Sequence, residues 1–198
     1  MFRLYLMALF GLFLAGCFAM HSTLDIQYTP AQPLDSPAPE TRRVVWEKLE
    51  WKPALTESEA VGIRKETVAG LQTSSIFLTP RPDEWFTAAA KLEFKNLGLH
   101  QGGGPDDPRI FIMVDQFFAE PLVTHIGYFL TAVTILHVYV TLPRQGKLFS
   151  RKFVGKSKSW EVFWLLASDY RETLLESAQL ALHESARETR KLIESEDR

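Results

Sequence analysis

The sequence predicts an α+β fold, a two-layer sandwich in which a mostly antiparallel sheet of four to five strands carries two helices on one face. Two observations predict it. Several short stretches alternate apolar and polar side chains, and two longer stretches repeat apolar residues at the spacing of an amphipathic helix. Their order is strand, loop, strand, helix, three strands, helix, which favours helices packed against one side of a sheet.

The first residues have the pattern of a secretory signal. Arg3 supplies a positive charge, residues 4–15 form an apolar stretch, and Ala15 and Gly16 are the small residues that a signal peptidase needs. The apolar stretch is too short for a membrane-spanning helix, which takes roughly 20 residues. We therefore expect residues 1–16 to be a signal peptide.

Cys17 is the only cysteine in the chain and directly follows this segment. The run from Leu14 to Cys17 resembles the bacterial lipobox, which implies cleavage before Cys17 and acylation of its thiol with palmitate-like chains. Two or more acyl chains would anchor the mature protein stably in a membrane. The alternative is a plain secretory signal with a coincidental cysteine. No second cysteine remains for a disulfide.

Phe18 and Ala19 follow the cysteine. In Gram-negative lipoproteins an aspartate directly after the lipidated cysteine tends to retain the protein in the inner membrane. By resemblance to that sorting rule, we expect a lipid anchor in the periplasmic leaflet of the outer membrane.

Residues 17–40 are rich in proline and small polar residues, a composition that predicts an extended tether. Within it, residues 24–30 are a candidate extended segment lying on the domain. Residues 41–198 are then predicted to form one α+β periplasmic domain.

The predicted elements before the first helix are short. Residues 43–51 alternate imperfectly and predict a strand, and residues 75–78 predict another. Between them, residues 53–70 predict a long loop with a helical turn near 57–60.

Residues 83–97 predict the first helix, with Asp83 as its N-cap and Gly98 as a left-handed residue at its end. The predicted apolar face includes Leu92. We expect Lys91, Glu93 and Lys95 on the solvent side.

Residues 109–120, 129–142 and 147–154 predict three strands joined as an antiparallel meander, since they are dense in apolar and β-branched residues. Residues 168–195 predict a long closing helix. Its apolar stripe comprises Tyr170, Leu174, Leu175, Ala178, Leu182, Ala186 and Ile193.

Composition excludes two classes of protein. The 22 basic and 24 acidic residues nearly balance, so the chain lacks the basic footprint of a nucleic-acid-binding protein. Hydrophobic residues make up 46%, which is typical of a globular domain rather than a disordered one.

Motifs for catalysis or metal binding are not recognisable in the sequence. His183 and Glu184 begin a zincin-like motif, but Arg187 stands where the second histidine belongs. The glycine-rich loop 102–107 leads into a strand without the lysine of a phosphate loop, so we interpret it as a connection. We expect a protein that is not an enzyme, with no catalytic residues, no metal and no cofactor.

Large aromatic residues gather in two stretches, residues 117–129 and 159–167. We predict an interaction surface made of Phe129, Trp160, Phe163 and Trp164. Residues 159–167 could extend the closing helix, cap the core or form an exposed apolar surface. We expect Phe163 and Leu166 to be buried, and Trp160 and Trp164 to be at least partly exposed.

The lipobox, "VVWEKLEW" with Gly62 after it, "RIFIMVDQFFAE", "TAVTILHVYVTL" and "KLFSRKFVGKS" resemble, in order and spacing, the YajG-type lipoproteins of proteobacteria. The resemblance covers about residues 43–194. It implies an envelope lipoprotein domain and supplies no catalytic residues. Similar domains occur in accessory subunits of lipid-transport systems.

Two functions follow as expectations. The first is a lipid-anchored, non-enzymatic module that binds a protein or lipid partner of the cell envelope. The alternative is an accessory lipoprotein of a lipid-transport system that holds an acyl chain between sheet and helices. A pocket between residues 159–167 and the meander would favour the alternative, and a filled core with an exposed apolar surface would favour the first.

Overall fold

A computed structural model describes residues 22–30, 41–52, 59–65, 72–161 and 164–196 of the chain, so Cys17 and Phe163 lie outside the described residues. In chain order the elements are β1 (Ser22–Asp25), β2 (Arg42–Trp51), β3 (Ala60–Lys65), β4 (Gln72–Thr79), α2 (Pro82–Asn96), β5 (Leu99–Gln101), β6 (Arg109–Thr124), β7 (Gly127–Leu142), the short 3-10 helix η1 (Pro143–Gln145), β8 (Lys147–Glu161) and α3 (Ala167–Glu196).

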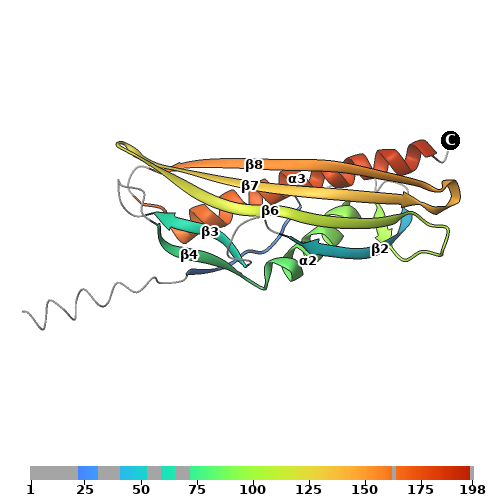
Figure 1. Cartoon of the computed structure of the whole chain (residues 1–198), viewed down its shortest axis with the longest axis horizontal. Coiled ribbons are helices and arrows are strands. Elements are labelled where there is room, and N and C mark those ends of the chain that lie inside the picture. The colour runs from blue at the N-terminus through green and yellow to red at the C-terminus, as the bar shows by residue number, and fades with distance from the viewer. Residues whose placement is uncertain (1–21, 31–40, 53–58, 66–71, 162–163, 197–198) are drawn as a thin grey trace, which may run out of the picture.

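The long strand β6 organises the sheet (Figure 1). One edge of β6 pairs with β7 in antiparallel register, and β7 pairs in turn with β8. The other edge is shared by two parallel strands: β2 pairs from Arg109 to Val114, and β3 pairs at Ala119. Beyond them, β5 continues from β2, while β4 and β1 continue from β3.

The predicted sheet of four to five mostly antiparallel strands is wrong. Among the described residues the sheet has eight strands, curls into a half-barrel and mixes parallel with antiparallel pairs. The error has a physical cause. With four and three residues, β1 and β5 are too short to show an alternation of period two, and alternation carries no information about the direction of a neighbouring strand.

The strands of the meander lie where they were predicted but are longer. β6 continues to Thr124 and β8 to Glu161, so Trp160 belongs to a strand. The predicted loop at residues 53–70 contains β3, and Ala60 begins that strand instead of ending a helical turn.

Both helices pack on the same face of the sheet. α3 contacts β7 and β8, and α2 contacts β2 and α3. In β7 the even-numbered residues from Leu130 to Leu142 are buried, whereas the odd-numbered ones are partly exposed. The helices therefore cover one face, and the other faces solvent.

α3 lies very close to the sheet at Gly155 of β8. A Cβ atom built on Gly155 would lie 1.9 Å from the Ser177 carbonyl oxygen and 2.8 Å from the Ala181 nitrogen. On the neighbouring strand, the Thr134 hydroxyl lies 2.8 Å from the Ser177 hydroxyl. Helix and sheet are thus in backbone contact at the middle of α3.

The predicted stripe of α3 is nearly correct. Six of its residues are buried, and Leu175 is only partly buried. Buried serine and threonine side chains share this face, and the small Ser177 and Ala181 lie at the close approach to Gly155. These serines and threonines are Thr173, Ser177, Ser185 and Thr189.

The segment 22–30 packs on the domain, as predicted for residues 24–30. Leu24 and Ile26 are buried in the core. The Trp85 indole donates a hydrogen bond to the Ile26 carbonyl oxygen at 2.6 Å, and the Gln179 amide donates to the Thr29 carbonyl oxygen at 2.6 Å. The sheet therefore begins at Ser22, five residues after Cys17.

α2 begins one residue earlier than predicted. Arg81 is its N-cap and Pro82 its first residue, so Asp83 lies in the first turn instead of capping it. Gly98, with φ 81°, is left-handed after the helix end, as predicted.

The prediction that Glu93 faces solvent is wrong, because its side chain is fully buried. Leu92, predicted on the apolar face, is 42% exposed. The buried face of α2 keeps a strict helical spacing that includes a carboxylate: Pro82, Trp85, Phe86, Ala89, Ala90, Glu93 and Phe94. Glu93 is tolerated there because two polar side chains from other elements satisfy it.

Candidate interaction surface

Exposed apolar side chains gather at the end of the sheet where the β6–β7 hairpin turns. We call this group the end patch. Its members are Leu122, Ile126, Phe129, Trp160, Trp164 and Leu166. Other exposed large apolar residues in the described part of the chain are scattered.

Three residues of the end patch come from neighbouring strands in one row. Leu122 of β6 is the register partner of Phe129 of β7, and Phe129 is the partner of Trp160 of β8. Side chains of paired residues point to the same face of a sheet, here the face without helices. The Phe129 and Trp160 rings stack with centroids 5.7 Å apart and an angle of 15° between their planes.

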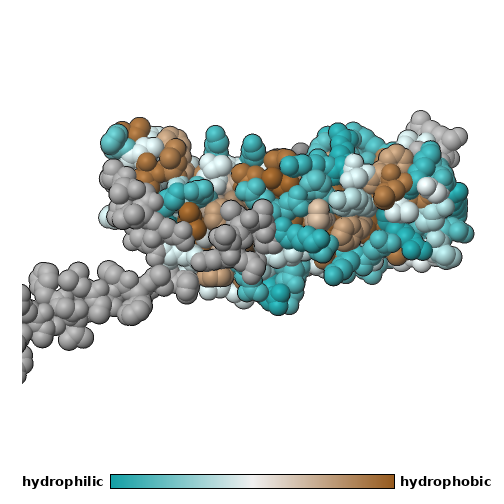
Figure 2. All heavy atoms as spheres, in the orientation of Figure 1, coloured by the Kyte–Doolittle hydropathy of each residue, from teal (hydrophilic) through white to brown (hydrophobic). Residues whose placement is uncertain are grey.

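The side chains of the end patch are too exposed to belong to the hydrophobic core. Trp164 is 76% exposed, Ile126 67% and Trp160 49%. Figure 2 shows apolar spheres clustered at the hairpin end of the molecule. Contiguous exposed apolar side chains are typical of a surface that meets a partner or a membrane.

Three of the four residues of the predicted interaction surface are described by the structure. Phe129 and Trp160 are brought together, and Trp160 and Trp164 are exposed, as expected. Phe163 lies outside the described residues. The expectation that Leu166 is buried is wrong, because it is 60% exposed just before the start of α3.

Sequence reasoning missed Leu122 and Ile126. The predicted strand ended at residue 120, so Leu122 had no assigned face, and Ile126 fell in an unassigned connection. A signal was present: the polar pair Thr124 and His125, with Gly127 just after it, interrupts two apolar stretches, as in a hairpin. The Thr124 hydroxyl donates to the Gly127 carbonyl oxygen at 2.8 Å and closes this turn.

Three lysines lie on the same outer face of β8 as Trp160. Lys152, Lys156 and Lys158 are exposed and alternate along the strand. Lysines are common on edge strands, where they discourage pairing with other chains. Lys158, two residues from Trp160, also places positive charge beside the end patch.

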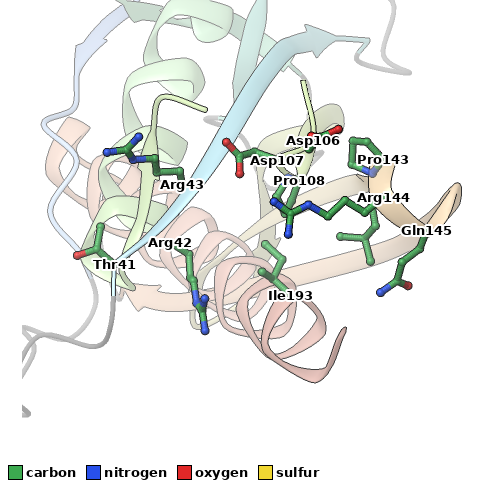
Figure 3. Close-up of a pocket in the computed structure, with 11 residues that line it drawn as sticks. Thr41, Arg42, Arg43, Asp106, Asp107, Pro108, Pro143, Arg144, Gln145 and Ile193 are labelled. Atoms are coloured by element: carbon green, nitrogen blue, oxygen red, sulfur yellow. The ribbon is translucent and has the colours of Figure 1, made fainter. Parts of the chain in front are cut away.

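A polar pocket of about 490 Å³ lies at the opposite end of the molecule (Figure 3). Arg42, Arg43 and Arg144 contribute to its lining, together with Asp106 and Asp107. The Asp107 carboxylate accepts a hydrogen bond from the Gly104 nitrogen at 2.6 Å. This bond closes the glycine-rich loop on itself, in agreement with its interpretation as a connection.

An apolar groove of about 380 Å³ runs between β8 and the C-terminal half of α3. Val138, Phe149, Phe153 and Leu192 line it. The groove is distant from residues 159–167, where an acyl pocket was anticipated.

The buried Glu93 carboxylate joins three elements. The Tyr28 hydroxyl donates to its Oε2 at 2.8 Å, and His183 Nδ1 lies 2.8 Å from its Oε1. Burial, together with the adjacent Glu93 carboxylate, raises the pKa of Tyr28 well above its usual value. The cluster fastens segment 22–30 and α3 to α2.

A second histidine–carboxylate pair, His137 with Asp115, is partly exposed, unlike the buried Glu93 cluster. His137 Nε2 lies 2.8 Å from the Asp115 carboxylate on the outer face of the sheet.

No group of three or more potential metal-binding side chains is found among the described residues. Within the same residues, neither helix is long and apolar enough to cross a membrane.

Comparisons with known proteins give similarity in fold only. No family model matches the sequence, and no curated protein is significantly similar to it. A crystal structure of a Xanthomonas campestris protein of the family DUF330 superposes with a TM-score of 0.57 at 13% identity, covering 86% of this chain and 94% of that one. A crystal structure of an uncharacterized protein superposes with a TM-score of 0.55 at 14% identity, covering 85% and 99%.

Proposed function

We propose that the protein is a non-enzymatic lipoprotein of the bacterial outer membrane. Acylated Cys17 anchors it in the periplasmic leaflet, and its folded domain acts as a partner-binding module in the periplasm. The end patch carries this proposal, because six exposed apolar side chains in one place are a surface for contact.

The polar side chains best suited to chemistry have structural partners. His183 and Tyr28 contact the buried Glu93, His137 contacts Asp115, and Asp107 closes its own loop. This distribution supports a binding role over a catalytic one. The free edge of β8, which pairs only with β7 among the described strands, offers a second contact surface.

The family assignment rests on two kinds of support. The lipobox and strand motifs resemble the YajG-type lipoproteins, and the fold is similar to that of a DUF330 protein. We propose that the chain is an envelope protein of this general kind.

A second candidate is an accessory protein of a lipid-transport system. The apolar groove between β8 and α3 favours it, since Phe149, Phe153 and Leu192 could contact an acyl chain. Mass spectrometry of the purified protein under native conditions would detect a bound acyl chain, and its loss in a Leu192→Glu variant would assign it to the groove.

Replacement of Cys17 by serine is expected to abolish membrane association. A serine hydroxyl is a much weaker nucleophile than a thiol near neutral pH, so the thioether to the lipid would not form. Fractionation of cells grown with radiolabelled palmitate measures this directly. Wild-type protein should carry label and sediment with membranes, whereas the variant should carry none.

Ala19→Ser provides a matched control, because it alters a neighbouring residue that the lipobox does not require. This variant should retain label and membrane association. Label on the Cys17→Ser variant, or release of wild-type protein by high salt alone, would contradict lipid anchoring.

A further inference from the structure

We propose that the end patch rests on the bilayer that holds the Cys17 lipid, so that the domain stands on the membrane with its β6–β7 hairpin toward the lipid. The inference rests on the proposed acylation of Cys17. It assigns the end patch a single occupant, the surface of a phospholipid bilayer.

The chain enters the sheet from the hairpin end. β1 is parallel to β4, β4 is antiparallel to β3, and β3 is parallel to β6, so β1 runs opposite to β6. β6 ends at the hairpin, and β1 therefore starts toward it. Figure 1 shows β1 and the hairpin toward the same end of the molecule.

The link between the cysteine and the sheet is short. Five residue steps separate Cys17 from Ser22, and a fully extended chain covers at most about 18 Å in that length. Ser22 pairs with Ile76, Ile76 with Gly62, and Gly62 with Ala119 of β6. Ser22 therefore lies level with Ala119.

Measured along β6, the tip of the β6–β7 hairpin lies beyond Ser22 by nearly the maximum length of the chain between Cys17 and Ser22. Thr124, the last residue of β6, is five residues beyond Ala119, or about 17 Å at about 3.4 Å per residue. A domain standing on its hairpin would place Ser22 within reach of a lipidated Cys17.

The opposite end of the domain cannot take this position. Arg109, the first residue of β6, is ten residues before Ala119, or about 34 Å at the same rise per residue. A domain standing on that end would hold Ser22 farther from the bilayer than the link can span. Chain length thus excludes the opposite end and permits the end that carries the end patch.

The chemistry of the end patch suits a membrane surface. Tryptophan is enriched at the membrane–water interface, where its ring meets acyl chains and its N–H meets water and headgroups. Trp160 and Trp164 are the exposed tryptophans of this end, and Leu122 and Ile126 are exposed there too. Lys158, two residues from Trp160 on the outer face of β8, adds attraction for anionic headgroups.

Quenching of tryptophan fluorescence by brominated lipids tests the inference on the full lipidated protein. The protein is reconstituted into vesicles of phosphatidylethanolamine and phosphatidylglycerol whose acyl chains carry bromine near the headgroup. Wild-type protein should be quenched. A variant with Trp160→Phe and Trp164→Phe retains Trp46, Trp51 and Trp85, which pack in or against the core, and should lose more than half of that quenching.

The controls separate the inference from the function on which it rests. Mass spectrometry of the N-terminal peptide reports acylation independently, and an unacylated Cys17 would overturn both. An acylated, vesicle-bound protein whose quenching is equal in the two forms would overturn the inference alone. Two further results would also overturn the inference alone. One is crosslinking of two copies of the protein through the end patch; the other is an end patch covered by an envelope protein and not quenched by the lipid. The melting temperature of the double variant should stay within a few degrees of the wild type, since both residues are exposed.

Discussion

A Gly155→Val variant is expected to lose at least about 3 kcal/mol of the free energy of unfolding, at the upper end of the usual cost of overpacking. The Cβ atom of any larger residue would lie 1.9 Å from the Ser177 carbonyl oxygen, a backbone atom in the middle of α3. A side chain could rotate away from such a clash, but the helix must move as a whole. Its displacement would separate Thr134 from Ser177 and open the core beneath.

Urea unfolding followed by circular dichroism measures this loss. Gly104→Ala is the matched control, because a Cβ there meets only the Asp107 carboxylate at an ordinary 3.9 Å. The control should unfold like the wild type. A Gly155→Val variant with unchanged stability would contradict the close contact between α3 and β8.

A Glu93→Ala variant is expected to lose about 3 kcal/mol, because it leaves two largely buried polar groups without a partner at about 1–3 kcal/mol each. The Tyr28 hydroxyl and the His183 ring both contact this carboxylate. The variant should also loosen segment 22–30, since Tyr28 is one of its attachments to α2. Urea unfolding gives the energy, and hydrogen exchange of residues 22–30 gives the local effect.

Lys91→Ala is the control on the same helix, because Lys91 is exposed and its truncation should change stability little. Glu93→Gln should fall between wild type and Glu93→Ala, since an amide can still pair with both neighbours. Equal stability of Glu93→Ala and Lys91→Ala would mean that the buried cluster contributes nothing.

Long periodic elements could be predicted from the sequence, and short or paired features could not. The stripe of α3 and the three strands of the meander are visible because their apolar residues repeat over many positions. β1 and β5 are too short for any period. β6 is long enough to pair with both β2 and β3 along one edge. These pairings join residues far apart in the sequence, and no local sequence pattern predicts them.

Glu93 illustrates a second limit. Its position on α2 fits the buried face by spacing, yet a carboxylate is normally assigned to the solvent side. The partners that make its burial possible, Tyr28 and His183, lie 65 and 90 residues away. Only the fold brings them together.

The sequence indicates some of the residues of the end patch, but it does not show which residues lie side by side in it. Aromatic residues near 129 and 160 indicated a surface, because they exceeded what a small core requires. The alignment of Leu122, Phe129 and Trp160 in one row depends on the register of three strands. Strands that were predicted too short could not place these residues side by side.

The depth of two spin labels relative to the bilayer tests the central claim, that a lipid anchor at Cys17 holds the hairpin end on the membrane. Cys17 is the only native cysteine, so an Ile126→Cys or an Arg144→Cys variant of the acylated protein offers one free thiol for labelling. Ile126 lies at the hairpin and Arg144 in η1 at the opposite end. Accessibility to oxygen and to a water-soluble nickel complex should place the label at 126 at the headgroup region and the label at 144 in bulk water. Two labels equally exposed to water, in a protein that sediments with vesicles, would contradict the account.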